Sequence, residues 1–423
     1  MDLLVEKLDG SRYYLSQYKV LITDFEESAP SVTRNNKQLD QRNGNIDFGG
    51  WHTDKTINIT GYYRADDIDE EETLREKLYA LLSDPDGYYI TQLKTTPSVA
   101  MERPGETSGD YYDKLSNYPS HKRFLVYTEA PEMELVGNVN GTLLYKLTVE
   151  FKTMKLPYGE TLPVDISIDS PYKDVPVNLI IQSDLKPGYL SIDNGSVIDN
   201  NADFHSDNYI ATNGNTVFTL SSPDYVIKCS YNHLLQMYDS NKNFMGYQPI
   251  TSATQTLSKP NVAYIRLSIN FVDEGGTRGN LSDWLNNHRY KLEKGSVATD
   301  WCPNPTDSEY NSWYYSLSGN VSVPYSGSVP CNQIEQGFAI EFTAKESASS
   351  LSFKIDDTEL AYSGAVASGD VFMFSGFNYT QNKLSIVSKT NKAYFILQPD
   401  KPNRITCNVP GTVRIIGFQN LYA

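Results

Sequence analysis

Cysteine is scarce in this chain, with four residues in 423, Cys229, Cys302, Cys331 and Cys407. None belongs to a CxxC pair, so the sequence gives no support for a zinc site or thiol redox chemistry, and we expect free thiols. Basic residues are also few: 36 Lys and Arg stand against 52 Asp and Glu, a net charge of −16. Binding nucleic acid or anionic lipid needs clustered cations, so we expect neither partner.

Long apolar runs are missing as well. No run approaches the roughly 18 residues that a membrane-spanning helix needs. The acidic N-terminus has no apolar stretch of signal-peptide length. We therefore expect a soluble protein made in a cytoplasm without a secretion signal, and no insertion into a membrane.

Catalytic motifs are absent too. The sequence contains no HExxH, GxSxG, Walker or strand-following GxGxxG pattern. Its five histidines are scattered at positions 52, 121, 205, 233 and 288, without metal-ligand spacing. A glycosidase carboxylate pair stays possible in the Gly-rich loop that holds Asp273, Glu274 and Asp283. We expect no enzyme, no cofactor and no metal; the alternative is a glycan-degrading enzyme with an accessory binding module.

Tyrosine, glycine and proline are abundant, at 31, 27 and 21 residues. Tyrosine suits pleated surfaces, and glycine and proline mark turns, so the composition favours β-structure. At about 100–200 residues per domain, the length predicts two to four domains.

The stretch 42–64 organises the first part of the chain. Gly44, Gly49 and Gly50 predict a loop, and residues 56–62 then alternate, with Ile57 and Ile59 on one face, as in a half-buried strand. The acidic run 66–72 opens a helix, for which Asp69 is the expected N-cap. Leucines 74, 78, 81 and 82 fall on one face of that helix.

Further strands are predicted at 20–25, 88–93, 124–127 and 141–152, with a long polar excursion of open role at 99–122. One helix among several strands indicates an α+β sandwich. The order of these pieces, with the segments 42–63, 69–82 and 141–153, resembles the N-terminal domain of the distal tail proteins of long-tailed phages. That resemblance implies a hexameric ring at the end of the tail tube.

Short strands and turns recur in the middle segment, at 217–220, 225–229, 234–238 and 264–271, with a hairpin turn at 239–242. This spacing favours a β-sandwich or jelly roll. The closing phrase YKLEKGSVATDWCPNP resembles the last strand of jelly-roll carbohydrate-binding modules inserted in phage tail proteins. Such modules stack aromatic rings on sugars, and Tyr231, His233, Tyr247 and Trp284 are our candidates for that role, although each could instead pack against the sandwich.

Four aspartates share one Asn/Asp-rich run, at positions 193, 199, 203 and 207. Oxygen-rich loops can hold Ca²⁺, but this spacing does not match an EF-hand loop. Turn-forming Asx residues are the default interpretation.

Strands recur after a second linker, at 338–344, 351–355, 371–374, 384–387, 393–397 and 413–418. The last thirty residues combine a β-run, a Pro-rich turn and a closing strand. This ending resembles the galectin-like C-terminal domain of the same distal tail proteins. Whether that domain binds a glycan stays open.

The sequence therefore predicts a mainly β protein of three parts. Residues 1–164 form an α+β sandwich ring domain, residues 165–304 an inserted jelly-roll β-sandwich, and residues 305–423 a galectin-like β-sandwich. The resemblance implies a virion protein at the tail tip, a homo-hexamer that joins the tail tube (major tail protein) to the tail-tip (tail-associated) protein, and an inserted module that binds host cell-wall polysaccharide. A bacterial surface lectin is the remaining alternative, disfavoured because no signal peptide or anchor is evident.

Overall fold

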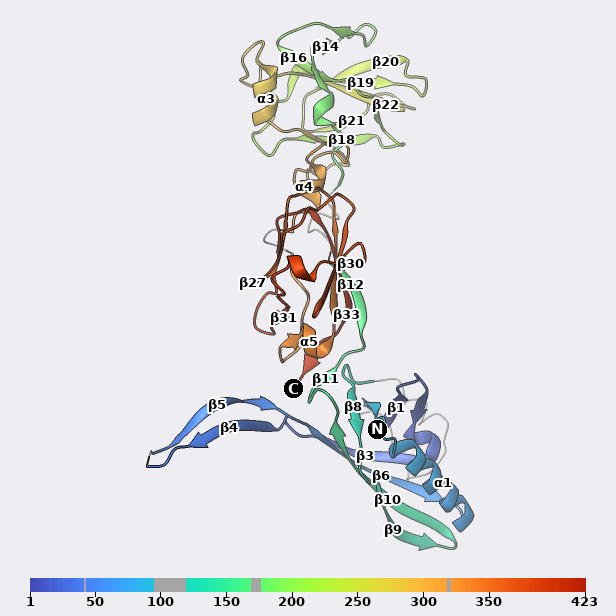
Figure 1. The fold of residues 1–423 in the computed structure, drawn as a ribbon. Helices are drawn as coiled ribbons and strands as arrows, with labels where there is room; N and C mark the ends of the chain where they lie inside the picture. The colour runs from blue at the N-terminus through green and yellow to red at the C-terminus, as the bar shows by residue number, and fades with distance from the viewer. Residues whose placement is uncertain (42, 95–118, 169–175, 318–320) are drawn as a thin grey trace.

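The protein is mainly β, and its strands enclose three separate hydrophobic cores arranged along a line (Figure 1). The computed structural model describes residues 1–41, 43–94, 119–168, 176–317 and 321–423. The N-terminal domain lies at one end, the sandwich made from the middle of the chain lies at the other, and the C-terminal sandwich lies between them. The predicted fold class is confirmed at the level of mainly β structure.

The N-terminal domain is built on one sheet in the order β2-β1-β7-β8-β10-β6-β3, with β9 paired to β10. Strand β6, which lies between β10 and β3, buries Ile57 and Ile59 on one face, as predicted. At Gly61 an added Cβ would lie 2.9 Å from Ile22 Cδ1 and 3.1 Å from the Leu21 carbonyl oxygen, so the neighbouring strand leaves little room for a side chain there. The strands are β1 (Asp2–Lys7), β2 (Arg12–Tyr14), β3 (Val20–Glu27), β6 (Thr56–Ala65), β7 (Tyr88–Leu93), β8 (Phe124–Tyr127), β9 (Glu132–Val139) and β10 (Thr142–Thr153).

Helix α1 (Ile68–Leu82) packs on this sheet through the four leucines that its spacing predicted. Its N-cap is Asp67, whose carboxylate accepts the Glu70 N–H at 2.8 Å. The prediction that Asp69 caps the helix was wrong by two residues, because Ile68 already has helical geometry and Asp69 lies in the first turn. An acidic first turn still suits the positive end of the helix dipole.

Two strands leave this domain as a long hairpin, which we call the arm. Strands β4 (Val32–Gln38) and β5 (Asn45–His52) pair only with each other among the described residues and project to one side (Figure 1). The predicted loop in the stretch 42–55 is therefore wrong, because residues 45–52 form a strand. Neither strand has a buried residue, so no half-buried alternation marks them in the sequence. Residues 99–118 of the polar excursion lie outside the described part of the chain.

The middle segment forms a two-sheet sandwich around its own core. One sheet has the order β13-β16-β22-β19-β20 with β17 on β22, and the other has the order β21-β18-β23. The predicted hairpin joins β19 to β20, but the predicted strand at 225–229 is wrong, since that stretch is irregular and Val226 is 91% exposed. The elements are β13 (Leu185–Pro187), β14 (Tyr189–Leu190), β15 (Val197–Ile198), β16 (Asp203–Ser206), β17 (Ile210–Ala211), β18 (Val217–Ser221), β19 (Ser230–Tyr238), β20 (Phe244–Ile250), β21 (Thr254–Thr256), β22 (Tyr264–Asn270), α3 (Leu281–Asn287) and β23 (Lys291–Lys294).

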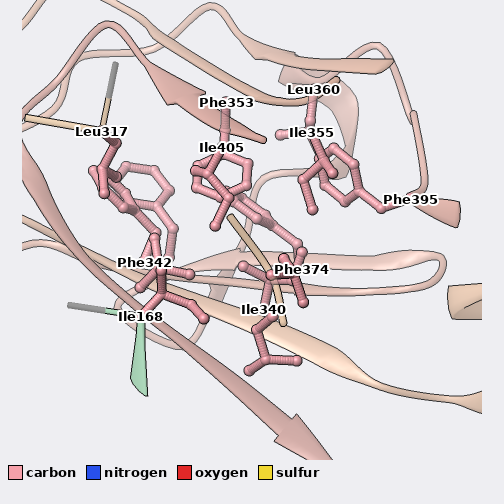
Figure 2. Packing of buried hydrophobic residues seen from close by; sticks show 14 of the residues in the cluster. Ile168, Leu317, Ile340, Phe342, Phe353, Ile355, Leu360, Phe374, Phe395 and Ile405 are labelled. Carbon is pink, nitrogen blue, oxygen red and sulfur yellow. The ribbon is translucent and has the colours of Figure 1, made fainter. Parts of the chain in front are cut away.

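The C-terminal sandwich packs the sheet β12-β33-β25-β28-β29-β30 against the sheet β27-β26-β32. Aromatic residues fill its core, among them Phe342, Phe353 and Phe374 (Figure 2). The predicted strands at 384–387 and 393–397 shrink to two residues each. The elements are β12 (Val164–Ile168), α4 (Tyr310–Tyr314), β24 (Cys331–Asn332), α5 (Gln333–Gln336), β25 (Ala339–Ala344), β26 (Leu351–Ile355), β27 (Thr358–Tyr362), β28 (Val371–Ser375), β29 (Asn378–Gln381), β30 (Leu384–Ser385), β31 (Ile396–Leu397), β32 (Ile405–Cys407), β33 (Gly411–Phe418) and β34 (Leu421–Tyr422).

Strand β12 fixes where the middle sandwich enters the chain. It pairs antiparallel with β33, and Ile168 points into the C-terminal core (Figure 2). The boundary expected between residues 164 and 165 therefore falls inside a strand of the C-terminal sheet. The chain begins that sandwich, leaves it for the middle sandwich, and then returns to complete it.

The N-terminal domain and the C-terminal sandwich meet through a short strand, β11 (Gly159–Glu160), which pairs with β34. Arg123 and Glu160 exchange two backbone hydrogen bonds of 2.9 Å, and the Arg123 guanidinium also pairs with Glu6 and Glu160. The junction thus combines backbone pairing with an ion-pair network.

Candidate functional site

Tyr231 lies at the start of β19 and its ring is open to solvent. It is 79% exposed, and the neighbouring Asn232 amide donates to the Asp273 carboxylate at 2.6 Å. An open aromatic face next to an amide and a carboxylate is the combination that holds a sugar ring and its hydroxyls. Tyr231 therefore provides an open aromatic ring, and its chain neighbour Asn232 is already bonded to Asp273.

His233 lies two residues further along β19 and is fully buried. The Asn270 N–H donates to its Nδ1 at 3.3 Å, so Nε2 carries the proton and donates to Glu274 Oε1 at 2.5 Å. The other Glu274 oxygen accepts the Lys228 N–H at 3.0 Å. A buried imidazole cannot reach a saccharide, so this position does not support the predicted contact of His233 with sugar. The pair instead fixes the irregular stretch 225–229 against β19.

Trp284 lies on α3 and is half-buried. Its indole N–H donates to the Tyr290 hydroxyl at 2.8 Å, and its ring stacks on His288 with the centroids 3.6 Å apart. Tyr225 meets the indole edge-on and shares a 2.6 Å hydrogen bond with Tyr290. Burial raises the pKa of Tyr290 to about 12, so both phenols keep their protons at neutral pH. These contacts anchor α3 to the sandwich and leave little of the indole face free for a ligand.

Tyr247 lies on β20, opposite Gln236 of β19, and is 41% exposed. Ile250, three residues further along β20, is the partner of Ser230, next to Tyr231. The structure therefore does not gather the four predicted residues in one place. Tyr231 and Tyr247 are separate exposed rings, His233 is buried and Trp284 is packed.

Two aspartates of the Asn/Asp-rich run have protein partners. Asp203 is buried and accepts the Asn200 amide, while Asp207 is mostly exposed and lies 3.6 Å from Arg266. Within the described ranges, no group of three or more His, Cys, Asp or Glu side chains is arranged to hold a metal ion. In the same part of the chain, no helix is long and apolar enough to cross a bilayer.

The arm carries a surface that the sequence did not reveal. Val32, Phe48 and Trp51 are all more than half exposed on a hairpin that has no core of its own. Three large apolar side chains on one projecting element mark a contact surface. The sequence signal was available in the two aromatic residues that flank Gly49 and Gly50, but the glycines suggested a loop.

Comparison with known proteins identifies the N-terminal domain. The family model described as the phage tail protein RIFT-related domain matches residues 8–153. No curated protein matches. Among solved structures, the Dit protein of phage SPP1, described as a hub adsorption apparatus of phages that infect Gram-positive bacteria, is 9% identical with a TM-score of 0.41, over 100% of this chain and 99% of that one.

The phage P2 baseplate in its activated, calcium-containing conformation is 10% identical with a TM-score of 0.29, over 99% of this chain and 97% of that one. At TM-scores below 0.5, these likenesses establish nothing further about this chain. The family model confirms the resemblance for the N-terminal domain. Residues 8–153 of this chain are thus similar to the RIFT-related domain of phage tail proteins.

Proposed function

We propose that this protein is the distal tail hub of a long-tailed phage. In this role it forms a homo-hexameric ring at the tail tip, between the tail tube and the tail-tip protein. The match of residues 8–153 to a phage tail domain carries the proposal. The protein acts as a structural component of the virion and not as an enzyme.

The arm supports ring assembly. It is a two-stranded hairpin with apolar side chains on its surface, and isolated hairpins are marginally stable in water. Packing against the next subunit of a ring would remove Phe48 and Trp51 from water and stabilise the hairpin. Burying most of two aromatic side chains contributes several kcal/mol, at about 25 cal/mol per Å².

The inserted sandwich supports a receptor-binding role. It lies at the end of the molecule opposite the N-terminal domain, so a ring of N-terminal domains leaves it projecting (Figure 1). The exposed Tyr231 and Tyr247 provide rings for the apolar faces of sugars in the host cell wall. Single sugar contacts are weak, and several copies on one ring raise avidity by about 10²–10⁴.

The mass of the protein in solution tests the ring. Light scattering after size-exclusion chromatography should give six times the 47.6 kDa chain mass, or a smaller species that closes into rings on tails. Phe48→Ser should shift the equilibrium toward monomer. Phe377→Ser is the matched control, because Phe377 is also exposed but lies on the C-terminal sandwich. Equal behaviour of the two variants would refute a role for the arm in assembly.

Sedimentation with cell walls of the phage's host tests the saccharide. Wild-type protein should bind, and Tyr231→Ala and Tyr247→Ala should each bind several-fold more weakly than Tyr394→Ala, an exposed tyrosine of the C-terminal sandwich. Release of reducing sugar from the walls would instead support the glycan-degrading enzyme. That alternative has little support from the loop 273–283, because protein donors occupy both oxygens of Glu274.

A further inference from the structure

A cleft of about 690 Å³ lies where α3 faces the chain segment that leaves the inserted sandwich. One wall is formed by α3 and the adjoining Arg289, and the other by residues 307–309 and the 3-10 turn Gln182–Asp184. Volumes of about 300–1,000 Å³ are typical of small-ligand sites. None of the four residues predicted for sugar binding lines this cleft.

Both walls of the cleft are held in place. The Asp307 carboxylate accepts the Gln182 N–H at 3.0 and 3.3 Å and the Asn304 N–H at 3.0 Å. The Gln182 amide in turn donates to the Leu285 carbonyl at 3.2 Å, which ties the turn to α3. The cleft is therefore preorganised, which reduces the entropy that a ligand must lose on binding.

Arg289 presents a fixed donor at the edge of the cleft. Its Nε and Nη2 donate to Asp224 at 3.1 and 2.7 Å, and its guanidinium lies over the Trp301 ring at 4.7 Å. The Asp224 hydrogen bonds also raise the pKa of Arg289. Among the described residues, Nη1 has no hydrogen-bond partner, so it can donate to a carbonyl or hydroxyl oxygen in the cleft.

The charges around the cleft exclude anionic ligands. The cleft and its edge carry one guanidinium, that of Arg289, and three carboxylates, those of Asp224, Asp307 and Glu309. Asp224 already neutralises the arginine, so phosphate groups and uronic acids would meet two further negative charges. The ligand must be neutral or cationic.

We propose that this cleft binds an N-acetylated amino sugar of the cell wall. The inference rests on the proposed saccharide-binding function and gives it a second ligand site. An acetamido group offers a carbonyl oxygen to Arg289 Nη1 and an N–H to the Glu309 carboxylate. Leu281 and Pro187 supply apolar surface for its methyl group and for the C–H face of the ring. The Asn286 amide has no hydrogen-bond partner among the described residues, so it can bond to ring hydroxyls.

The test measures binding of the N-acetylglucosamine trimer to the full chain by isothermal titration calorimetry, with the neutral β-1,4-linked glucose trimer, which lacks the acetamido groups, as the comparison. Wild-type protein should bind the acetylated trimer at least tenfold more tightly. Ser282→Trp, which fills the cleft from an exposed position on α3, should abolish binding, and Asn286→Ala should weaken it about fivefold. Asn287→Ala is the matched control, since Asn287 is the next residue of α3 and does not line the cleft.

Equal affinities of Asn286→Ala and Asn287→Ala, or no effect of Ser282→Trp, would overturn the assignment of the cleft. Equal or tighter binding of the glucose trimer would overturn the acetamido specificity. If wild-type protein binds host cell walls but not the acetylated trimer, this inference fails while the proposed function stands. If wild-type protein binds neither, the proposed saccharide-binding function fails with it.

Discussion

A substitution of Trp284 distinguishes a packing role from a sugar-stacking role, because the two roles predict opposite results for it. Trp284→Phe keeps an aromatic ring against His288 and Tyr225 but removes the indole N–H that donates to Tyr290. The lost hydrogen bond costs about 0.5–1.5 kcal/mol, and the smaller ring loses some packing in a half-buried site. We expect a total loss of about 1–2 kcal/mol in the free energy of unfolding.

Differential scanning calorimetry of the full chain measures this loss. A destabilisation of this size should lower the Tm of the inserted sandwich by several degrees and leave the other transitions in place. Below that transition the variant should bind host cell walls like wild-type protein. Tyr231→Ala is the opposite case: Tyr231 makes few contacts, so its loss should change stability by less than about 0.5 kcal/mol and should weaken binding.

The reasoning would be refuted by the reverse pattern for Trp284. If Trp284→Phe leaves the Tm unchanged and weakens cell-wall binding tenfold, the indole stacks on the saccharide. In that case the hydrogen bond to Tyr290 contributes nothing measurable to stability, and Trp284 is a sugar-binding residue.

Three other substitutions test the fold and its pH dependence. Gly61→Ala should destabilise the N-terminal domain by about 1–3 kcal/mol in urea titrations, whereas Gly137→Ala, where an added Cβ meets nothing within 4 Å, should not. Ile168→Ala should lower the Tm of the C-terminal sandwich and not that of the N-terminal domain, at a cost of about 2–4 kcal/mol. Burial raises the pKa of Asp203, so the folded state binds its proton more tightly than the unfolded chain. The free energy of unfolding therefore falls as pH rises from the ordinary carboxyl range through that raised pKa, and Asp203→Asn should reduce this fall.

The parts of the fold that the sequence predicted are those with one buried face. The leucines of α1 and the alternation in β6 and β10 reflect burial directly. Every second side chain of a half-buried strand, and every third or fourth side chain of a packed helix, faces the core. The arm was not predicted because both of its faces are exposed to water and its glycines are typical of loops. The stretch 225–229 was wrongly predicted as a strand: its apolar Val226 is exposed, and the Lys228 N–H bonds to the Glu274 carboxylate instead of to a strand partner.

The candidate site was predicted only in part, because residue type does not reveal which face of an aromatic ring is free. Tyr231 and Trp284 both stood in polar surroundings in the sequence, yet one is open and the other is stacked on His288. The cleft at α3 could not be predicted at all. Its walls come from residues about 125 positions apart, joined by the hydrogen bonds between Gln182 and Asp307.

The place of insertion determines how firmly the middle sandwich is held. The chain leaves the C-terminal sandwich at Ile168 and re-enters it at Leu317, and both side chains belong to the same core. The returning segment is bound on both sides: Asp307 caps the Gln182 turn of the inserted sandwich, and Ser312 donates to Glu346 of the C-terminal sandwich at 2.7 Å. A module joined at one end by a flexible linker would spread its copies over many orientations, which dilutes the effective concentration of their binding sites. A returning segment bound on both sides restricts that spread, so copies on the proposed ring would present their saccharide sites in one direction, where avidity is greatest.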